Sequence, residues 1–409
     1  MRILYSIGMC CYQAGIKTAS LFGHIKAKQM KNGWRMVWPE LEKMQLQKND
    51  VAWFHASSLG EFEQARPVIE AFRKDHEGWK IVVTFFSPSG YEVRKNYPLA
   101  EYTCYLPIDT ASNARKFVKM VNPKKVFFVK YDFWFNYMRE IKKCGAEMVI
   151  FSTIFRDNQY FFKWYGGWFL RQLKGFDHMF VQNEQSVTLL QNHGIERCSI
   201  AGDTRFDRVS DITKAAKRFP EIERFIGDST VLMAGSSWEP DEENLYRYAD
   251  KRQDSFKLIV APHMIHEEHL TKIESLFGKE RCVRYTQLTE QDCNKQILII
   301  DTMGMLAAMY RYATVAYIGG GFGQGIHNIL EALTFGKPVV FGPKYQKFKE
   351  ARDIIEQGGG KSYTQKEELD SILDTWLADA TEYQKASAIC THYVESNIGA
   401  TKKILKCSC

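Results

Sequence analysis

The stretch VAWFHASSLGEFEQARPVIEAFR (51–73) joins a strand to a helix and sets the pattern for the rest of the chain. Residues 51–56 form a continuous apolar run typical of a buried strand, and apolar residues then recur with helical period from Phe62 to Phe72. Glu61 stands at the start of the expected helix, where unpaired N–H groups stabilise a negative charge by about 0.3–1 kcal/mol. The carboxyl end of a strand is also where open α/β sheets bind ligands, so Glu61 equally suits a base that takes a proton from a substrate. Both interpretations are open at this point.

Short apolar runs alternate with helical stretches along the whole chain. The expected strands are 51–56, 81–86, 125–130, 148–153, 178–183 and 198–202 in the first half, and 230–235, 257–262, 281–285, 297–301, 315–320 and 338–342 in the second. Continuous apolar strands separated by helices predict parallel sheets that are covered on both faces. We therefore expect an α/β fold with two doubly wound, Rossmann-like domains facing a central cleft. This is the GT-B plan of many glycosyltransferases, although two-domain dehydrogenases share the same periodicity.

The length of the chain also favours two domains, because 409 residues exceed what one ordinary core accommodates. The segment 207–220 is polar and ends in proline, which suits a hinge. We expect an N-terminal helical segment over 1–30, a first domain over 31–209 and a second over 210–409. The last helix is expected to pack back on the first domain.

The overall charge is mildly basic, since 55 lysine and arginine residues stand against 48 aspartate and glutamate residues, a net +7. This excess suits an anionic partner or a membrane surface, and the absence of a nucleic-acid motif predicts no nucleic-acid partner. The ten cysteines are irregularly spaced, from the adjacent Cys10 and Cys11 to Cys407 and Cys409. Without paired CxxC motifs we expect no zinc site, and reduced thiols in a cytoplasmic setting.

The run ILYSIGMCCYQAGI (3–16) is uncharged and apolar, and basic residues follow it from Lys17 to Arg35. It is shorter than the roughly 20 residues needed to span a bilayer. It fits a helix that lies in the membrane interface while basic side chains reach lipid phosphates. A helix that simply docks on the protein is the alternative.

The segment VAYIGGGFGQGIHNILEALTFGKPVVFG (315–342) carries the strongest sign of a ligand site. A strand runs into a glycine-rich loop, and a helix is expected to start near His327, with Glu331 one turn in. Glycines let the backbone approach a ligand closely, and a helix N-terminus offers N–H groups to an anion. The glycine spacing differs from GxGxxG and no acidic residue follows at about 20 positions, which argues against a dinucleotide. A tight structural turn is the alternative.

Several motifs occur in a fixed order along nearly the whole chain. They are HASSLGE (55–61), YLPID (105–109), AGDTRFDRV (201–209), AGSSWEPDEE (234–243), APHMIHEE (261–268), DTMGML (301–306), HNILEAL (327–333) and FGPKYQKFKEA (341–351). Together they resemble the 3-deoxy-D-manno-octulosonic acid (Kdo) transferases of lipopolysaccharide assembly. Each motif is weak alone, but the ordered set is specific.

The resemblance implies an inverting glycosyltransferase that transfers Kdo from CMP-Kdo to the lipid A precursor lipid IVA, with no metal and no cofactor. It implies that Glu61 is the catalytic base and that Arg205 stabilises the transition state. The residues expected to contact CMP are Pro262, His263, Met303, Gly304, Met305, Asn328, Ile329, Leu330 and Glu331. Those expected to contact the acceptor are Ser57, Ser58 and Gly60. The first domain would then bind the acceptor and the second the CMP-sugar, at the cytoplasmic face of the inner membrane.

The chain departs from the family pattern at several of these places. His263 stands where the family has arginine, so a permanently charged phosphate clamp becomes one that titrates. Glutamate is common where Met305 stands. In VKYDFWFN (129–136) the family reads E-T-E-x-W-P, and its first glutamate is thought to assist catalysis. Lys130 takes that position and Asp132 the second acidic one, so both are candidates for a catalytic role; for Asp132, a solvated loop acid is the alternative.

Two further interpretations are open. The aromatic run YFFKWYGGWF (160–169) suits core packing or, if exposed near the cleft, a place for acyl chains. The twin sheets also suit another nucleotide-sugar glycosyltransferase, an epimerase, or a non-catalytic nucleotide- or lipid-binding protein. The two enzymes are expected to lack the ordered motif set, and the binding protein would tolerate loss of Glu61.

Overall fold

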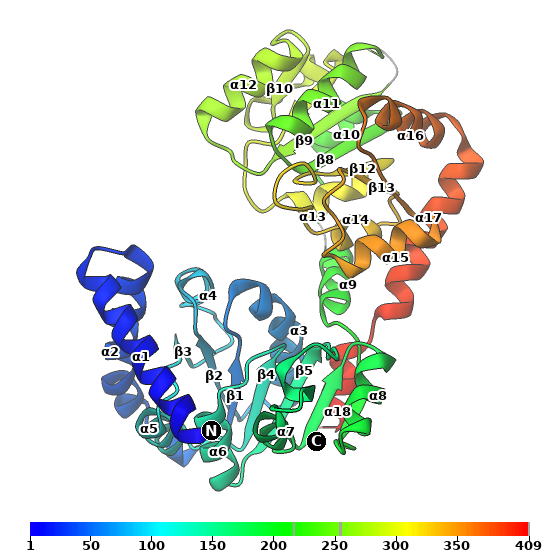
Figure 1. Ribbon diagram of the computed structural model, residues 1–409. Coiled ribbons are helices and arrows are strands. Elements are labelled where there is room, and N and C mark those ends of the chain that lie inside the picture. The colour runs from blue at the N-terminus through cyan, green and yellow to red at the C-terminus, as the bar shows by residue number, and fades with distance from the viewer. Residues whose placement is uncertain (216, 253–255, 408–409) are drawn as a thin grey trace. The chain divides into compact units, whose positions relative to one another are not determined.

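The computed structural model describes residues 1–215, 217–252 and 256–407. It divides into two compact units: Met1–Arg208 with Ile398–Cys409, and Val209–Asn397 (Figure 1). The chain therefore leaves the first unit, builds the second and returns to the first. Residue 216 of the expected hinge, Cys409 and the side chain of Cys407 lie outside the described residues.

The first unit is built on seven parallel strands in the order β3-β2-β1-β4-β5-β6-β7. The strands are β1 (Val51–His55), β2 (Lys80–Phe85), β3 (Tyr102–Tyr105), β4 (Lys125–Val129), β5 (Glu147–Thr153), β6 (His178–Val181) and β7 (Cys198–Ile200). The strand order reverses between β1 and β4, which pair directly. In open parallel sheets, ligands bind outside the carboxyl ends of the strands at such a switch point.

Helices cover both faces of this sheet. They are α1 (Arg2–Leu21), α2 (Ile25–Met44), α3 (Leu59–Asp75), α4 (Pro88–Arg94), α5 (Ala111–Val121), α6 (Phe135–Lys143), α7 (Gly167–Leu173), α8 (Glu184–Asn192) and α18 (Ala400–Cys407), and α9 (Arg205–Ala215) crosses into the second unit. Trp53 of β1 packs in the core with residues of α2, α5 and α6, whereas Phe54 packs with residues of α3 and α18. Burial on both faces explains why β1 is apolar throughout.

The second unit has seven parallel strands in the order β10-β11-β9-β8-β12-β13-β14, with its switch point between β8 and β12. The strands are β8 (Val231–Ser237), β9 (Lys257–Pro262), β10 (Cys282–Arg284), β11 (Ile297–Ile299), β12 (Val315–Ile318), β13 (Val339–Phe341) and β14 (Gly360–Ser362). The helices are α10 (Pro220–Ile226), α11 (Glu239–Asp250), α12 (Glu267–Phe277), α13 (Leu306–Met309), α14 (Leu330–Thr334), α15 (Lys349–Gln357), α16 (Lys366–Ala378) and α17 (Ala380–Asn397).

The predicted fold class is confirmed, because both units are doubly wound α/β sheets. Every strand expected from an apolar run is present, but each half contains a seventh strand that the sequence did not reveal. The missed strands, β3 and β14, lie at the sheet edges, where a strand has one neighbour. The sequence of β14, Gly-Lys-Ser, has no apolar run, so its strand conformation depends on pairing with β13. The division into an acceptor domain and a donor domain stays a prediction.

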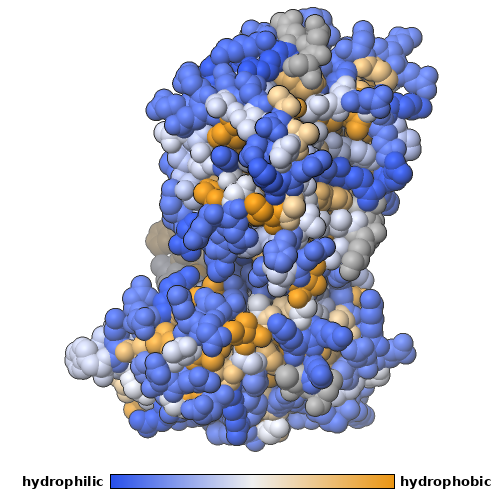
Figure 2. All heavy atoms as spheres, turned by 90° about the vertical axis from the view of Figure 1, so that its right-hand side faces the viewer, coloured by the Kyte–Doolittle hydropathy of each residue, from blue (hydrophilic) through white to orange (hydrophobic). Residues whose placement is uncertain are grey.

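Helix α1 packs one part of its surface on the first unit and leaves large apolar side chains exposed. The Tyr5 hydroxyl donates a hydrogen bond to the Asp109 carboxylate at 2.6 Å, and its ring packs edge-on against Phe135. In contrast, Ile3 and Ile7 are 77% and 53% exposed. On the face shown in Figure 2, hydrophilic residues dominate and hydrophobic ones gather only in small groups. No helix within the described ranges is long and apolar enough to cross a bilayer.

Helix α18 completes the first unit from the far end of the chain. Ala400 and Ile404 are fully buried in the core that contains Phe54. The carboxylate of Asp207 accepts hydrogen bonds from the N–H groups of Gly399 and Thr401, at 2.6 and 2.7 Å. A negative charge at a helix N-terminus satisfies N–H groups that have no partner inside the helix.

The Asp207→Ala variant is expected to lower the protection of α18 amides from hydrogen exchange by at least about tenfold, because hydrogen bonds to a charged group contribute about 1.5–3 kcal/mol. Mass spectrometry of peptides covering 398–407 measures this effect. Asp211→Ala, which removes an exposed acid of the same helix α9, is the matched control. Unchanged exchange in Asp207→Ala would contradict the capping role.

Candidate active site

The turn between β1 and α3 places Ser57, Ser58, Gly60 and Glu61 at the carboxyl end of the sheet. Ser58 is the N-cap of α3 and forms a capping box with Glu61. The N–H and Oγ of Ser58 donate to Oε2 of Glu61 at 2.8 and 3.0 Å. The capping interpretation of Glu61 therefore describes its contacts. Within the described chain no hydrogen bond reaches Oε1 of Glu61, so one carboxylate oxygen is left for a substrate hydroxyl.

Asp132 lies against the same turn, although it is 75 residues further along the chain. Ser57 donates to it twice, from Oγ at 2.6 Å and from N–H at 3.1 Å. Asp132 is only 9% exposed. The alternative of a solvated loop acid is therefore wrong.

The backbone of Lys130 turns the chain from β4 into the loop that carries Asp132. It follows β4 with a left-handed backbone, φ +57°, and its N–H donates to the carbonyl of Phe151 at 3.0 Å. A non-glycine residue in this region costs of order 1–3 kcal/mol, so the surrounding structure must impose it. Of the two candidates for the role of the family glutamate, Asp132 is the one that contacts Ser57.

His55, the last residue of β1, supports this loop as a neutral ring. Trp134 donates from Nε1 to Nε2 of His55 at 2.8 Å, so the ring proton lies on Nδ1 and faces Thr84 Oγ1, also at 2.8 Å. Complete burial lowers the pKa of His55 to about 3. Asp132 Oδ2 approaches Nε2 to 3.6 Å, but with a neutral ring this contact is not an ion pair.

The carboxyl group of Asp132 holds its proton more tightly than an ordinary aspartic acid does. Burial and, next, the negative charge of Glu61 raise the pKa of Asp132 to about 8, although the two hydrogen bonds from Ser57 act to lower it. Asp132 is therefore mostly protonated at neutral pH. A buried carboxyl group with a raised pKa is typical of acid–base sites.

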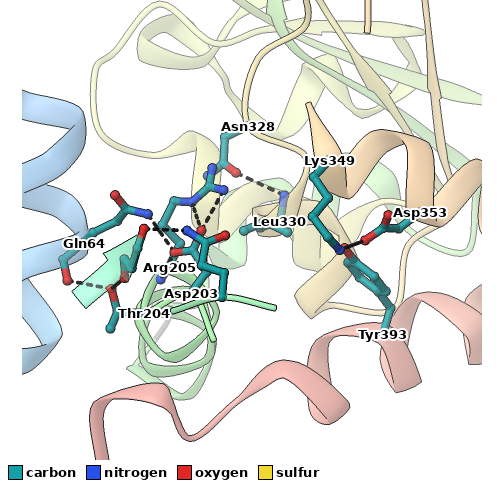
Figure 3. Close-up of polar contacts among 11 residues, drawn as sticks. Gln64, Asp203, Thr204, Arg205, Asn328, Leu330, Lys349, Asp353 and Tyr393 are labelled. Carbon is teal, nitrogen blue, oxygen red and sulfur yellow. Dashed lines mark hydrogen bonds and ion pairs between the residues drawn. The ribbon is translucent and has the colours of Figure 1, made fainter. Parts of the chain in front are cut away.

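Arg205 begins α9 and is fixed by a buried carboxylate (Figure 3). Asp203 accepts from Nε of Arg205 with Oδ2 and from Nε2 of Gln64 with Oδ1, both at 2.9 Å. Burial acts to raise the pKa of Asp203, but the charge and hydrogen bonds of Arg205 outweigh it and leave that pKa lower than usual. The side chain of Arg205 is two-thirds buried, and its guanidinium is paired with Asp203.

In the second unit, the glycine-rich loop after β12 is tightly packed. A Cβ on Gly319 would lie 2.2 Å from the carbonyl oxygen of Ser236, and a Cβ on Gly321 would lie 2.6 Å from the backbone of Gly342. The N–H of Gly320 donates to the buried carboxylate of Asp241 at 2.9 Å. The structural-turn interpretation therefore accounts for these glycines, whatever they also do for a ligand.

The prediction that a helix starts near His327 is wrong. The helix that follows the loop, α14, spans only Leu330–Thr334, so Glu331 lies in its first turn rather than one turn in. The reason is that neighbouring segments take the backbone groups: Ile326 N–H donates to the carbonyl of Lys344, and His327 N–H to that of Gly319. Residues 325–329 therefore form no helix, and anion binding at a long helix N-terminus has no basis here.

Three aromatic rings stack at the carboxyl end of β8, β9 and β12. The ring of His263 stacks on both Trp238 and His327, with centroid distances of 4.6 and 4.5 Å. Trp238 donates from Nε1 to Nε2 of His327 at 3.2 Å. Burial and the nearby His263 lower the pKa of His327. The structure thus joins two motifs of the sequence, APHMIHEE and HNILEAL, and adds Trp238, which sequence reasoning missed.

The other residues expected to bind CMP are distributed over this edge. Pro262 ends β9, and the turn 303–305 follows β11, the strand beside β9. Gly304 has φ +85° and Met303 is 76% exposed. The list is completed by Met305, whose Sδ accepts from Thr302, and by Asn328, Ile329, Leu330 and Glu331.

Among the residues expected to bind CMP, those of the segment 328–331 form hydrogen bonds with one another. Asn328 Oδ1 accepts from Leu330 N–H at 3.1 Å, and its Nδ2 donates to Glu331 Oε1 at 3.0 Å. The side chains of Ile329 and Leu330 are buried, so only their backbones are available to a ligand. Among the residues that the structure describes, no group of three or more His, Cys, Asp or Glu is placed to hold a metal ion; metal-free transfer stays a prediction.

Known proteins resemble this chain in sequence. Residues 31–208 match the family model of 3-deoxy-D-manno-octulosonic-acid transferase (kdotransferase). The Kdo transferase of Chlamydophila psittaci is 27% identical over 82% of this chain and 79% of its own length, and that of Aquifex aeolicus is 24% identical over 75% and 80%. This chain is a relative of the Kdo transferases. A bifunctional glycosyltransferase/methyltransferase of Fusobacterium nucleatum is 26% identical over 81% of this chain, which matches 53% of that protein.

Solved structures confirm the fold of this Kdo transferase relative. UDP-GlcNAc 2-epimerase from Neisseria meningitidis covers 87% of the chain, which in turn covers 98% of it, with a TM-score of 0.60 and 15% identity. A glycosyltransferase from Rickettsia africae covers 88%, with 97% of its own chain matched, a TM-score of 0.57 and 13% identity. The architecture is therefore that of GT-B enzymes. At this identity the likeness shows the fold alone.

The raised pKa of Asp132 makes stability depend on pH. Because this pKa, about 8, lies above the ordinary value of about 3.9, the folded state holds the proton more tightly, and unfolding becomes easier as pH rises from about 4 to 8. The Asp132→Asn variant is neutral throughout, so its urea midpoint is expected to exceed that of the wild type at pH 8 and to approach it at pH 5. Asp157→Asn, at an exposed acid, is the control. Parallel pH profiles for Asp132→Asn and wild type would refute the assignment.

Proposed function

We propose that this protein is an inverting glycosyltransferase that transfers Kdo from CMP-Kdo to a hydroxyl of a lipid A precursor such as lipid IVA. The observation that carries the proposal is the pair of carboxyl groups, Glu61 and Asp132, which the Ser57–Ser58 turn gathers at the switch point of the first sheet. The similarity to Kdo transferases over most of the chain supports the sugar and the reaction class.

Glu61 acts as the general base. The acceptor oxygen attacks the anomeric carbon of CMP-Kdo from the face opposite CMP, the bond from that carbon to the phosphate oxygen breaks, and the acceptor proton passes to Glu61. Base assistance of this kind contributes typically about 10²–10⁴-fold to the rate. The capping box orients the carboxylate through Oε2, which presents Oε1 to the acceptor.

Asp132 contributes in its protonated form, as a hydrogen-bond donor rather than as a second base. A buried carboxyl group kept neutral at pH 7 can donate a proton to a substrate oxygen in a hydrogen bond. This role accommodates the departure from the family glutamate, because the carboxyl pair is retained with one member moved by two positions. Ser57 holds Asp132, and we place Ser57, Ser58 and Gly60 beside the acceptor.

Positive charge stabilises the departing CMP. Arg205 is preorganised for this by its hydrogen bonds to Asp203, so little reorganisation is needed when charge develops. In the second unit, the nucleotide binds at the edge formed by Pro262, His263 and the turn 303–305, together with the segment 328–331. The stack of His263 on Trp238 and His327 offers an imidazole to the phosphate, which an arginine would contact as a permanent cation.

The acceptor is lipid-embedded, so we also propose that the protein works at the cytoplasmic face of the inner membrane. Helix α1 exposes Ile3, Leu4 and Ile7, and basic residues from Lys17 onward follow this apolar surface. A helix of this kind lies in the interface without spanning the bilayer. Each basic residue close to an anionic surface adds about 1 kcal/mol, which salt weakens.

The base assignment predicts that Glu61→Gln lowers product formation at least about 10²-fold, because glutamine keeps the shape and hydrogen-bonding reach but does not take up the proton. Incubation with CMP-Kdo and lipid IVA, followed by mass detection of the product, measures this. Glu63→Gln, two residues further on the same helix, is the control. CMP-Kdo binding should survive in Glu61→Gln. Near-normal turnover of that variant would contradict the assignment of Glu61 as the base.

The membrane role predicts that Ile7→Glu lowers binding to vesicles containing anionic phospholipid by about tenfold or more, because it replaces an exposed apolar side chain by a charge that resists burial. Sedimentation with vesicles at moderate ionic strength measures the bound fraction. Thr18→Glu adds the same charge at an exposed polar position of α1 and serves as the control. Equal losses in the two variants would show that net charge, and not the apolar surface, governs binding.

A further inference from the structure

The first unit contains an aromatic pocket of about 610 Å³, a size that suits a small apolar ligand. Three segments build it: helix α1, the loop between β4 and α6, and the aromatic run 160–169. The lining residues, which define the aromatic pocket, are Tyr5, Met9, Tyr131, Asp132, Phe133, Trp134, Phe135, Tyr160, Tyr165 and Phe169. Asp132 is the one acidic or basic residue in this lining, so the pocket offers no cation to a phosphate.

The rings that form the inner walls of the pocket are held by contacts with Asp109 and with one another. The Tyr5 hydroxyl is held by Asp109, so the ring rather than the hydroxyl faces the pocket. Phe135 packs at 5.0 Å on Tyr5 and at 5.5 Å on Phe169, between ring centroids. Rings locked in this way make a preformed surface, which lowers the entropy cost of binding.

The pocket connects directly to the carboxyl pair. Asp132 lines it and at the same time accepts both hydrogen bonds from Ser57. Trp134 also lines it and donates to His55 at the end of β1. A molecule that fills the pocket therefore ends at Asp132, the carboxyl group that the Ser57–Ser58 turn holds together with Glu61.

The outer rim of the pocket is exposed and amphipathic. Tyr131, Tyr160 and Tyr165 are 40%, 39% and 53% exposed, and the neighbouring Trp164 is 96% exposed. Tyrosine and tryptophan favour the boundary between lipid and water. Helix α1, which supplies Tyr5 and Met9 to the wall, is the helix with the exposed apolar side chains proposed to meet the membrane.

We propose that the aromatic pocket binds one acyl chain of the glycolipid acceptor and so positions the acceptor hydroxyl at Glu61. This rests on the proposed function, since it specifies where part of the acceptor lies. An acyl chain is the occupant that fits, because it is apolar along its length and is attached to a sugar whose hydroxyl must reach the carboxyl pair. The pocket also gives a use to the run 160–169 beyond the core packing of Phe161.

Direct binding can be measured without transfer. A lysophospholipid with a brominated acyl chain, used below its micelle concentration, is expected to quench tryptophan fluorescence saturably, because Trp134 lies in the pocket wall. Tyr165→Glu is expected to weaken the apparent affinity by about tenfold, since a carboxylate at the mouth resists desolvation. Asn158→Glu places the same charge at an exposed polar residue outside the lining, keeps every tryptophan, and is expected to leave the apparent affinity unchanged. Absence of saturable quenching, or equal effects of both substitutions, would overturn the proposal.

A second measurement tests whether the chain belongs to the acceptor. The KM of the wild type for lipid IVA is expected to be lower than for the same acceptor with its acyl chains removed, and Tyr165→Glu should raise only the KM for lipid IVA. Quenching without such a difference in KM would assign the pocket to a bulk membrane lipid and overturn the acceptor role. Failure of every acceptor to receive Kdo would overturn the proposed function, whereas quenching that Tyr165→Glu selectively weakens would still support an acyl-chain site.

Discussion

The hydrogen bonds that Ser57 and Ser58 donate to two different carboxyl groups organise the carboxyl end of β1. Ser58 ties Glu61 to the first turn of α3, and Ser57 ties Asp132 to the same point from a loop that comes from β4. Because β1 and β4 are neighbours at the switch point of the sheet, these bonds close the turn over the place where a parallel sheet offers its ligand site. The Trp134–His55 hydrogen bond and the aromatic pocket both depend on where this loop is held.

Two carboxylates that lie near one another repel, and this repulsion favours protonation of one of them. Both cannot remain ionised in a buried setting, so the more buried one, Asp132, keeps its proton. The partly exposed Glu61 accepts the hydrogen bonds of Ser58 at the start of α3, where a helix favours a negative charge. The chain thus obtains a proton acceptor and a proton-bearing group from two carboxylic acids, because burial and the nearby charge of Glu61 both favour the protonated form of Asp132.

Central strands were predictable from sequence because each is buried on both faces and reads as an apolar run. Two of the four edge strands, β3 and β14, were not; β14 is Gly-Lys-Ser and is a strand only through its partner β13. Glu61 and Arg205 could be named from their motifs, but the contact of Ser57 with Asp132 joins residues far apart in the chain, and no local pattern encodes it. The stack of His263 on Trp238 and His327 likewise depends on three strands meeting at one edge. The predicted start of α14 was too early. The N–H groups before this helix donate to carbonyl groups of neighbouring loops, and the local sequence does not reveal those contacts.

Helix α18 has a consequence for the order in which the protein is made. Its residues Ala400 and Ile404 fill part of a core that β1 and α3 begin to form near the start of the chain. A ribosome must therefore synthesise the whole of the second unit before that core can be sealed. Until then the nascent first unit exposes the apolar groove that α18 later fills, which is the kind of surface that chaperones recognise and that aggregation exploits. The second unit is an insertion within the first, so the time taken to synthesise it is the least time for which that groove stays uncovered.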